Sequence, residues 1–447
     1  MFRKFPTKTC VPALPWIFDL TGEEKNKKML RSIALCAAVI TLLVGMMPIS
    51  GHAQTFQTLY SFAGAPDGEE PFQSNLILVN GALLGTTGIG GTLNAGTIFK
   101  LTGTGKETVL YSFSGGADGN QPSSGLLRDS KGNLYGTTFW GGNTNCVLNS
   151  NYPAGCGTVY KLDSAGHLSV LYTFQGGTDG AWPQGLVLDS AGNLYGVTFY
   201  GGDLNCPLFP GGGCGVVFKI SSTGTFSVLY TFHGGSDGGI PEGFLTLHGA
   251  AVYGGTANGG ISANCGGFGC GVVFGVSTST GTEKALYAFT GDTDGAVPVS
   301  QFLFDTNGNL YGAAVAGGNT ACTNNGFVGC GVIFRLSPSG TETVLHTFQG
   351  TPNDGATPTW GLTVDASGNT YGTTIYGGSA NLGTVFKFSP KGGVETVLHS
   401  FTGPDGQYPQ SGLLSLGKTG LISNTVGGGN LSCNSPNGCG TVFRIVP

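Results

Sequence analysis

The chain has 447 residues, of which 40% are apolar, 10% are charged and 83 are glycine. The apolar fraction supports a packed core and argues against disorder, while the abundant glycine implies many turns. Seven of the 19 basic residues but only three of the 24 acidic ones lie in residues 1–53, which leaves a net charge of −9 in residues 54–447. An acidic body with scattered lysine and arginine argues against a nucleic-acid partner, because phosphate contacts require clustered positive charge.

The N-terminal segment has the pattern of an export signal. Residues 25–31 are basic, residues 33–47 are apolar, and residues 51–53 form a small-residue cleavage pattern. This order is typical of a secretory signal peptide cleaved after Ala53, here with an extended n-region at residues 1–28. The apolar run is short for a transmembrane helix, so no stable membrane span is expected after cleavage. We therefore expect a signal peptide at 1–53 and a secreted or otherwise extracytoplasmic mature part at 54–447.

The rest of the chain consists of seven copies of one unit. Residues 185–232 show it most fully: an apolar strand, an Asp-Ser-x-Gly-Asn turn, an aromatic strand containing a glycine, a Gly-Gly loop and two further strands. Every copy ends in Leu-Tyr-x-Phe or Leu-His-x-Phe, and the leucines of this signature are 51 to 61 residues apart: Leu59, Leu110, Leu171, Leu229, Leu286, Leu345 and Leu398. A fixed internal period indicates a repeat architecture in which each unit buries its faces against its neighbours.

The two ends of the repeat region are complementary fragments of one unit. The first copy begins with its last strand alone, at residues 57–62, and the last copy ends at residues 440–447 without that strand. In a closed ring the N-terminal strand completes the C-terminal blade and removes two exposed sheet edges. We therefore expect an all-β fold, a seven-bladed β-propeller of four-stranded blades closed in this way. A β-helix has shorter repeats, and no 3.6-residue helical pattern is present.

A glycine follows a tyrosine in the second strand of most units. These glycines are expected to let a neighbouring blade approach closely. They are Gly136, Gly196, Gly254, Gly312 and Gly372.

Ten cysteines in residues 54–447 fall into five local pairs, each within the loop between the second and third strands. The two units with short loops at this place lack both cysteines, and this joint loss predicts disulfides within the loops of an exported protein. Zinc is disfavoured, because the loops contain neither CxxC spacing nor histidine. Rigid loops present a binding surface at low entropic cost. The predicted pairs are Cys146–Cys156, Cys206–Cys214, Cys265–Cys270, Cys322–Cys330 and Cys433–Cys439.

Each unit also carries Asp-Gly-x-x-Pro between its last strand and the first strand of the next unit. The favoured interpretation is structural: the aspartate caps the turn, glycine supplies a special φ angle and proline fixes the entry to the strand. The alternative is cation binding, with Ca²⁺ as the candidate, because carboxylates and carbonyls suit hard cations; no cofactor is required by the sequence. The aspartates are Asp67, Asp118, Asp179, Asp237, Asp294, Asp354 and Asp405.

No catalytic motif is evident. Ser236 matches a nucleophile elbow only by chance, because the equivalent turns of the sister units have other residues there. His346 and His399 replace the tyrosine of the repeat signature and are interpreted as packed or edge residues. A pair of catalytic acids drawn from different blades would leave no linear motif, so an enzyme remains an alternative.

Aromatic residues near the cysteine loops are a candidate sugar-binding surface. Two of them, Trp140 and Tyr200, fit equally well as residues that close the seams between blades. The candidates are Trp140, Tyr152, Trp182, Tyr200, Phe209, Phe268 and Trp360.

The repeated text GLVLDSAGNLYGVT…GG…GTVFKL…VLYTF, with Asp-Gly-x-x-Pro between copies, resembles the bacterial GloVer (Gloeo-Verruco) tandem-repeat proteins over residues 59–447. Its GL-x-x-D-x-x-GNLY segment is more distantly similar to NHL-type propeller repeats. The resemblance implies an exported bacterial protein and supplies no catalytic residues.

We therefore expect a monomeric, non-enzymatic module that binds a polysaccharide, a cell-envelope component or an extracellular protein through its loop-bearing face. One alternative is an extracellular carbohydrate-active hydrolase or lyase with acids at the mouth of the propeller channel. Another is a structural protein of the cell surface or matrix.

Overall fold

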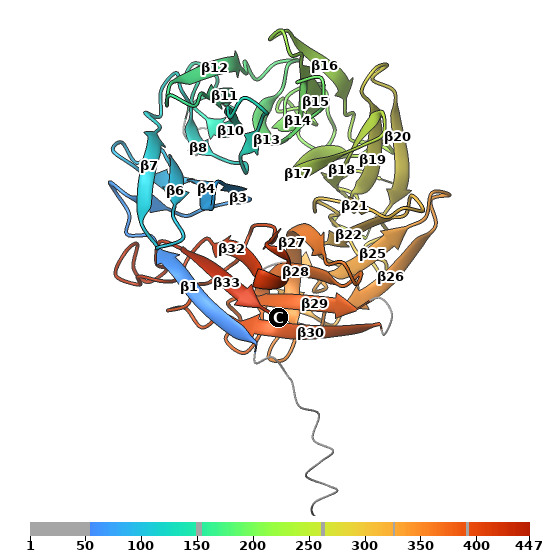
Figure 1. Ribbon diagram of the computed structural model, residues 1–447. Helices are drawn as coiled ribbons and strands as arrows, with labels where there is room; N and C mark the ends of the chain where they lie inside the picture. Colours follow the sequence, from blue (N-terminus) through green and yellow to red (C-terminus); the bar gives the residue numbers. More distant parts are fainter. Residues whose placement is uncertain (1–53, 149–153, 261–263, 325–326, 390–392) are drawn as a thin grey trace, which may run out of the picture. The chain divides into compact units, whose positions relative to one another are not determined.

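The computed structural model describes residues 54–148, 154–260, 264–324, 327–389 and 393–447. Gln54–Pro447 form one compact unit. Within it, seven antiparallel β-sheets are arranged in a ring, as Figure 1 shows. The first strand of each sheet faces the centre of the ring and the fourth lies on its perimeter (Figure 1). The predicted all-β, seven-bladed propeller is therefore confirmed.

The first four blades follow one another along the chain. Blade 1 contains β3 (Ile77–Val79), β4 (Ala82–Thr87), β6 (Thr97–Leu101) and β7 (Glu107–Ser112). Blade 2 contains β8 (Asn120–Pro122) and β9 (Leu127–Arg128), which both pair with β10 (Leu134–Trp140), then β11 (Thr158–Leu162) and β12 (Leu168–Thr173). Blade 3 contains β13 (Ala181–Leu188), β14 (Leu194–Tyr200), β15 (Val216–Ile220) and β16 (Phe226–Thr231). Blade 4 contains β17 (Gly239–His248), β18 (Ala251–Asn258), β19 (Val272–Ser277) and β20 (Glu283–Ala288).

Three more blades complete the ring. Blade 5 contains β21 (Leu303–Phe304), β22 (Leu310–Ala314), β25 (Val332–Leu336) and β26 (Glu342–Thr347). Blade 6 contains β27 (Gly355–Val364), β28 (Thr370–Gly377), β29 (Thr384–Ser389) and β30 (Val394–Ser400). Blade 7 contains β31 (Leu414–Ser415), β32 (Leu421–Thr425), β33 (Thr441–Val446) and β1 (Thr55–Ser61), with a 3₁₀ turn, η1, at Gly417–Thr419. The short strands β2 (Gly68–Glu69) and β5 (Ile89–Gly90), and β23 (Thr323–Asn324) and β24 (Phe327–Val328), form two small hairpins.

Blade 7 is built from both ends of the repeat region. Strand β1 pairs antiparallel with β33, with Phe56 opposite Ile445 and Tyr60 opposite Val442. The two strands lie side by side in Figure 1. The N-terminal strand therefore supplies the fourth strand of the last blade and closes the ring, as the complementary repeat fragments predicted.

One contact recurs at every seam between blades. The phenylalanine of each Leu-Tyr-x-Phe or Leu-His-x-Phe signature is completely buried. It meets the ring of the third-strand aromatic of the following blade nearly edge-on, with centroids 5.0 to 5.3 Å apart. Burial of such rings is a main stabilising contribution to a core. The pairs are Phe62–Phe99, Phe113–Tyr160, Phe174–Phe218, Phe232–Phe274, Phe289–Phe334, Phe348–Phe386 and Phe401–Phe443.

The second-strand glycines make room within a blade rather than between blades. Gly196 pairs directly with Phe218 of its own blade, and a Cβ atom at Gly196 would lie 2.5 Å from Phe218 Cζ. The interpretation that a neighbouring blade approaches these glycines is therefore wrong for Gly196. The ring that fills the space is the same one that Phe174 of the preceding blade contacts, so the glycine determines where the seam contact is made.

The Asp-x-x-Gly-Asn turns join the first and second strands by side-chain hydrogen bonds. In blade 3, Asp189 Oδ1 accepts hydrogen bonds from the backbone N–H groups of Ala191 and Asn193, at 2.9 and 2.8 Å. Its Oδ2 atom accepts from Asn193 Nδ2 and from the Tyr195 hydroxyl, at 2.8 and 3.0 Å. Burial raises the pKa of Asp189, but the hydrogen bonds from Asn193 and Tyr195 outweigh it, and the pKa lies below its ordinary value. The motif is thus a structural turn.

Candidate binding face

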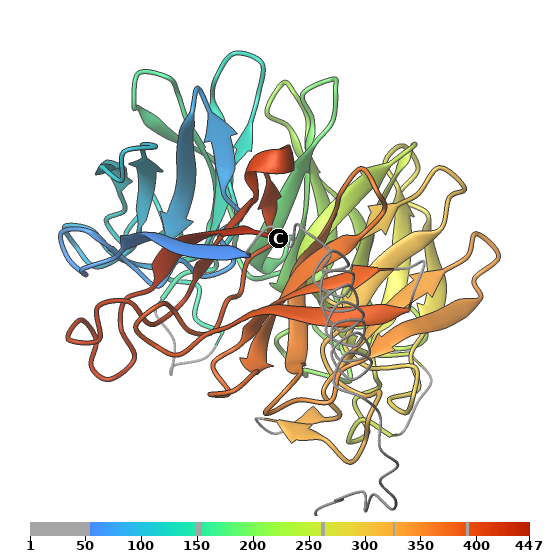
Figure 2. The ribbon, with the colours of Figure 1, turned by 60° about the horizontal axis from the view of Figure 1, so that its bottom comes forward.

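The Asp-Gly turns and the cysteine loops lie together at one end of each blade that has both. In blade 2 the turn glycine Gly176 is so close to the disulfide that a Cβ atom there would lie 2.4 Å from Cys146 Sγ. In blade 4 the equivalent Gly291 approaches the sulfur atoms of Cys265 and Cys270 in the same way. We call this end of the molecule the loop face. Figure 2 shows the blades from another side, with connecting loops at both ends of their strands.

Five disulfides stiffen the loop face, and each joins two cysteines of one loop. They are Cys146–Cys156, Cys206–Cys214, Cys265–Cys270, Cys322–Cys330 and Cys433–Cys439. So many disulfides indicate an oxidising, extracytoplasmic environment. Within the described residues, no helix has the length and apolar character needed to span a membrane.

The Asp-Gly carboxylates are engaged by protein groups. In blade 2, Asp179 Oδ2 accepts hydrogen bonds from the Tyr172 hydroxyl at 3.0 Å and from the backbone N–H of Gln175 at 2.9 Å. Equivalent tyrosine bonds reach Asp67, Asp118, Asp237 and Asp294, and His399 Nε2 lies 2.8 Å from Asp405 Oδ2. These contacts agree with the capping interpretation of the motif.

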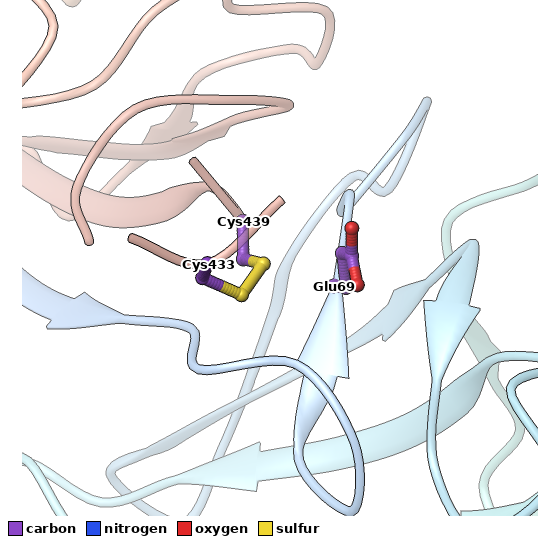
Figure 3. Close-up of side chains that lie close together, drawn as sticks. All are labelled: Glu69, Cys433 and Cys439. Carbon is purple, nitrogen blue, oxygen red and sulfur yellow. A yellow bond between two sulfur atoms is a disulfide. The ribbon is translucent and has the colours of Figure 1, made fainter. Parts of the chain in front are cut away.

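Two groups of potential metal-ligating side chains occur among the described residues, and one of the seven turn aspartates, Asp354, belongs to one of them. The other group consists of Glu69, Cys433 and Cys439. Figure 3 shows the Glu69 carboxyl group beside the Cys433–Cys439 disulfide. This group is therefore a disulfide next to a carboxyl group rather than a metal site in the oxidised protein.

A continuous cluster of aromatic rings lies where blades 2 and 3 meet at the loop face. Trp140, at the end of β10, contacts Trp182 at the start of β13, with ring centroids 6.4 Å apart. Trp182 contacts Tyr200 at 4.9 Å, and Tyr200 stacks on Phe209 of the cysteine loop at 4.5 Å. Trp140, Tyr200 and Phe209 are partly exposed, while Trp182 is 9% exposed. We call these four residues, with Phe72, Phe139 and Phe199, the aromatic cluster.

Phe72, Phe139 and Phe199 were missed by sequence reasoning. Phe139 packs on Trp140 with centroids 6.0 Å apart, and Phe199 on Tyr200 at 4.8 Å. Phe72, from the turn that leads into blade 1, reaches Phe139 at 6.3 Å. A signal was available in the sequence, because only units two and three have two successive aromatics before the Gly-Gly loop, Phe139-Trp140 and Phe199-Tyr200.

The remaining predicted aromatics lie elsewhere. Phe268, on the cysteine loop of blade 4, is 55% exposed and contacts no other ring among the described residues. Trp360 is only 4% exposed within β27. Tyr152 lies outside the described residues. The structure therefore brings together four of the seven candidates.

A cavity of about 560 Å³ opens beside the cysteine loop of blade 4. Its polar lining includes Asn258, Asn264, Asp292 and Thr320. Asn264 Nδ2 donates to Asp292 Oδ2 at 3.1 Å and to the Thr290 carbonyl at 3.1 Å. This cavity differs from the aromatic cluster in its polar rim and lies between other blades.

Partly buried carboxyl groups, each with one buried oxygen, lie at four of the seven seams. Each comes from the first part of an outer strand, and one of its oxygens has no hydrogen-bond partner among the described residues. Burial, and then the turn aspartate of the preceding blade, raise the pKa of each to about 7. They are Glu107, Glu283, Glu342 and Glu395.

The other three seams have an apolar residue at this position. Phe226 stacks on Tyr172 and Phe56 on His399, with centroids 3.7 Å apart in both cases. The third apolar residue is Leu168, at the same place in blade 2.

Comparison with known proteins shows the repeat family and the fold. A model of the Gloeobacter/Verrucomicrobia repeat matches residues 46–268, 146–329 and 320–447. No curated protein matches the sequence. One similar solved structure is the extracellular domain of a putative one component system from B. thetaiotaomicron, with 12% identity and a TM-score of 0.50 over 88% of this chain and 42% of that one.

Two further similar structures are those of putative lactonases. A putative gluconolactonase has 13% identity and a TM-score of 0.40 over 88% of this chain and 92% of that one. A putative 6-phosphogluconolactonase from Bacteroides uniformis has 15% identity and a TM-score of 0.44 over 73% and 83%. At these identities the similarity concerns the fold alone.

Proposed function

The chain belongs to the Gloeobacter/Verrucomicrobia repeat family, and from that premise we propose that it is an exported, non-enzymatic module that binds a polysaccharide through the aromatic cluster. The disulfides support the export, because they form and persist in oxidising compartments. The observation that carries the binding proposal is the aromatic cluster at the loop face.

Aromatic rings suit a sugar ligand because the C–H faces of a pyranose ring pack against a flat apolar surface. The cluster is held in place by the stack of Tyr200 on Phe209 and by the Cys206–Cys214 disulfide of the same loop. A surface ordered before binding loses little entropy when a ligand arrives. The net charge of −9 in residues 54–447 disfavours polyanionic sugars, so a neutral polysaccharide fits best.

The test is a glycan array probed with the purified, disulfide-oxidised protein. We expect reproducible binding to one class of neutral glycan. Trp140→Ala and Phe209→Ala should each weaken it by about tenfold or more, because a ring contact is worth about 1 kcal/mol or more in addition to the area it buries. Thermal melting of each variant establishes that it is folded.

Phe268→Ala is the matched control, because Phe268 is an exposed aromatic of another cysteine loop and should leave binding unchanged. A blank array, or binding that neither cluster variant weakens, would overturn the proposal.

A further inference from the structure

Three potential metal ligands meet at the perimeter of the seam between blades 5 and 6. His346 lies in β26, Asp354 in the turn that follows it, and Glu395 in β30 of the next blade. One ligand atom of each side chain lies within 4.8 Å of those of the other two. The side chains of His346 and Asp354 are only 18% and 13% exposed.

Two of these ligand atoms are buried without a hydrogen-bond partner. His346 Nε2 lies 3.4 Å from Asp354 Oδ2, yet neither it nor Glu395 Oε1 makes a hydrogen bond within the described part of the chain. Burying a polar atom without a partner costs about 1–3 kcal/mol. The seam therefore contains two lone-pair donors that an ion would satisfy.

The sister seams show that this combination is specific to one place. At the seam of blades 6 and 7, His399 Nε2 and Asp405 Oδ2 are hydrogen-bonded at 2.8 Å. Phe56, which has the strand position equivalent to that of Glu395, stacks on the imidazole there. At the three other seams with a buried glutamate, a tyrosine hydroxyl donates to the aspartate in place of a histidine. His233 Nδ1 also approaches Asp237 Oδ2, to 3.3 Å, but its side chain is 62% exposed. Among the described residues, only the seam of blades 5 and 6 brings the ligand atoms of an imidazole and two carboxyl groups within 4.8 Å of one another.

We propose that His346, Asp354 and Glu395 bind a divalent cation of the zinc class, which links blades 5 and 6. The 3.4 Å between His346 Nε2 and Asp354 Oδ2 suits two ligands each about 2.0–2.2 Å from one tetrahedral ion. An imidazole ligand selects zinc-like ions over calcium or magnesium, which prefer all-oxygen sites.

The charge balance also favours such an ion. The two carboxylates together neutralise a dication. No lysine or arginine forms an ion pair with either of them among the described residues, where every ion pair involves a histidine.

The test is calorimetric titration of chelator-treated, oxidised protein with ZnCl₂. We expect one equivalent to bind, and His346→Tyr and Glu395→Phe each to weaken that binding by at least the roughly 10–100-fold that loss of even an outer-shell partner causes. Each variant copies a residue already present at a sister seam, so it should fold, and its melting temperature checks this. Zinc should also raise the melting temperature of the unaltered protein, and should raise that of His346→Tyr and Glu395→Phe much less, because a ligand of the folded state stabilises it.

His399→Tyr is the matched control, since it alters the histidine of a seam that lacks the third ligand, and binding should persist unchanged. Co²⁺ absorption provides a second readout: imidazole and carboxylate ligands give weak visible bands without the intense charge-transfer band of a thiolate ligand, and all ten cysteines of residues 54–447 are paired in disulfides. Absence of stoichiometric binding, binding that both seam variants leave intact, or a thiolate band would overturn the assignment.

Discussion

At the scale of single residues, the repeat depends on a glycine that creates space for a ring. Gly196 lies opposite Phe218 in the neighbouring strand, and Phe218 in turn contacts Phe174 of the preceding blade at 5.3 Å. A methyl group at the glycine would displace the ring and with it the contact between the blades. The residue without a side chain is thus the one that sets the packing of the seam.

Gly196→Ala should therefore destabilise the protein by about 1–3 kcal/mol, the usual cost of overpacking a well-packed core. Urea denaturation followed by circular dichroism would measure it. Gly177→Ala is the control, because a Cβ atom at Gly177 meets nothing within 4 Å, and it should change the midpoint little. Equal effects of the two substitutions would contradict the packing argument.

At the scale of elements, the outer strands decide how one blade meets the next. A single position in these strands contains glutamate at four seams and an apolar residue at three. Burial and the neighbouring aspartate raise the pKa of Glu283 to about 7. In the folded protein its carboxyl group is therefore mostly neutral below about pH 7. Because the folded pKa lies above the unfolded value, the contribution of this group is fully present below about pH 4.5 and is lost as the pH rises towards 7.

Glu283→Phe should therefore stabilise the protein most at high pH. The new ring can stack on Tyr230 as Phe226 stacks on Tyr172, and no charge is buried. We expect the gain in melting temperature over the unaltered protein to grow between about pH 4.5 and 7 and to reach roughly 1–2 °C above that range. Leu168→Phe, at a seam without a glutamate at this position, should give no such pH-dependent gain.

The strands could be predicted from the sequence, but the seam contacts could not. Leu-Tyr-x-Phe was correctly assigned to an outer strand, and the cysteine pairing followed from loops that lose both cysteines together. The contact of Glu395 with His346 and Asp354 joins residues of two successive repeats across a seam. No local pattern predicts it, because the meeting depends on how two sheets twist past each other. The aromatic cluster was only partly foreseen for the same reason.

At the scale of the whole molecule, the ring is held by one repeated interaction. The edge-on contact of the signature phenylalanine recurs at the closing seams, where Phe401 meets Phe443 and Phe62 meets Phe99. The closure itself was predictable, because the first and last repeats are fragments of one unit. The closing blade therefore has the same seam contact as the blades built from continuous chain.

A circular permutant would test the closure directly. Joining Pro447 to Gln54 by a short linker and opening the chain in the exposed hairpin turn at Thr223-Gly224 leaves all seven sheets intact. Its melting temperature should stay within a few degrees of that of the original protein. Deleting residues 54–61 should lower it far more, because β33 then loses β1, its outer partner, and becomes an exposed edge. Similar melting temperatures for the two variants would contradict the closed ring.

The pairing of β1 with β33 also has a consequence for the order in which the protein folds. During synthesis from the N-terminal end, blades 1 to 6 can each form from strands that are close in sequence. Phe56 can pair only after Ile445 has been synthesised. A contact of such high sequence separation requires the ends of a long chain to find each other, which slows folding. Until that encounter, β1 is an open edge that another chain can pair with, so the final step of folding is also the step most exposed to aggregation.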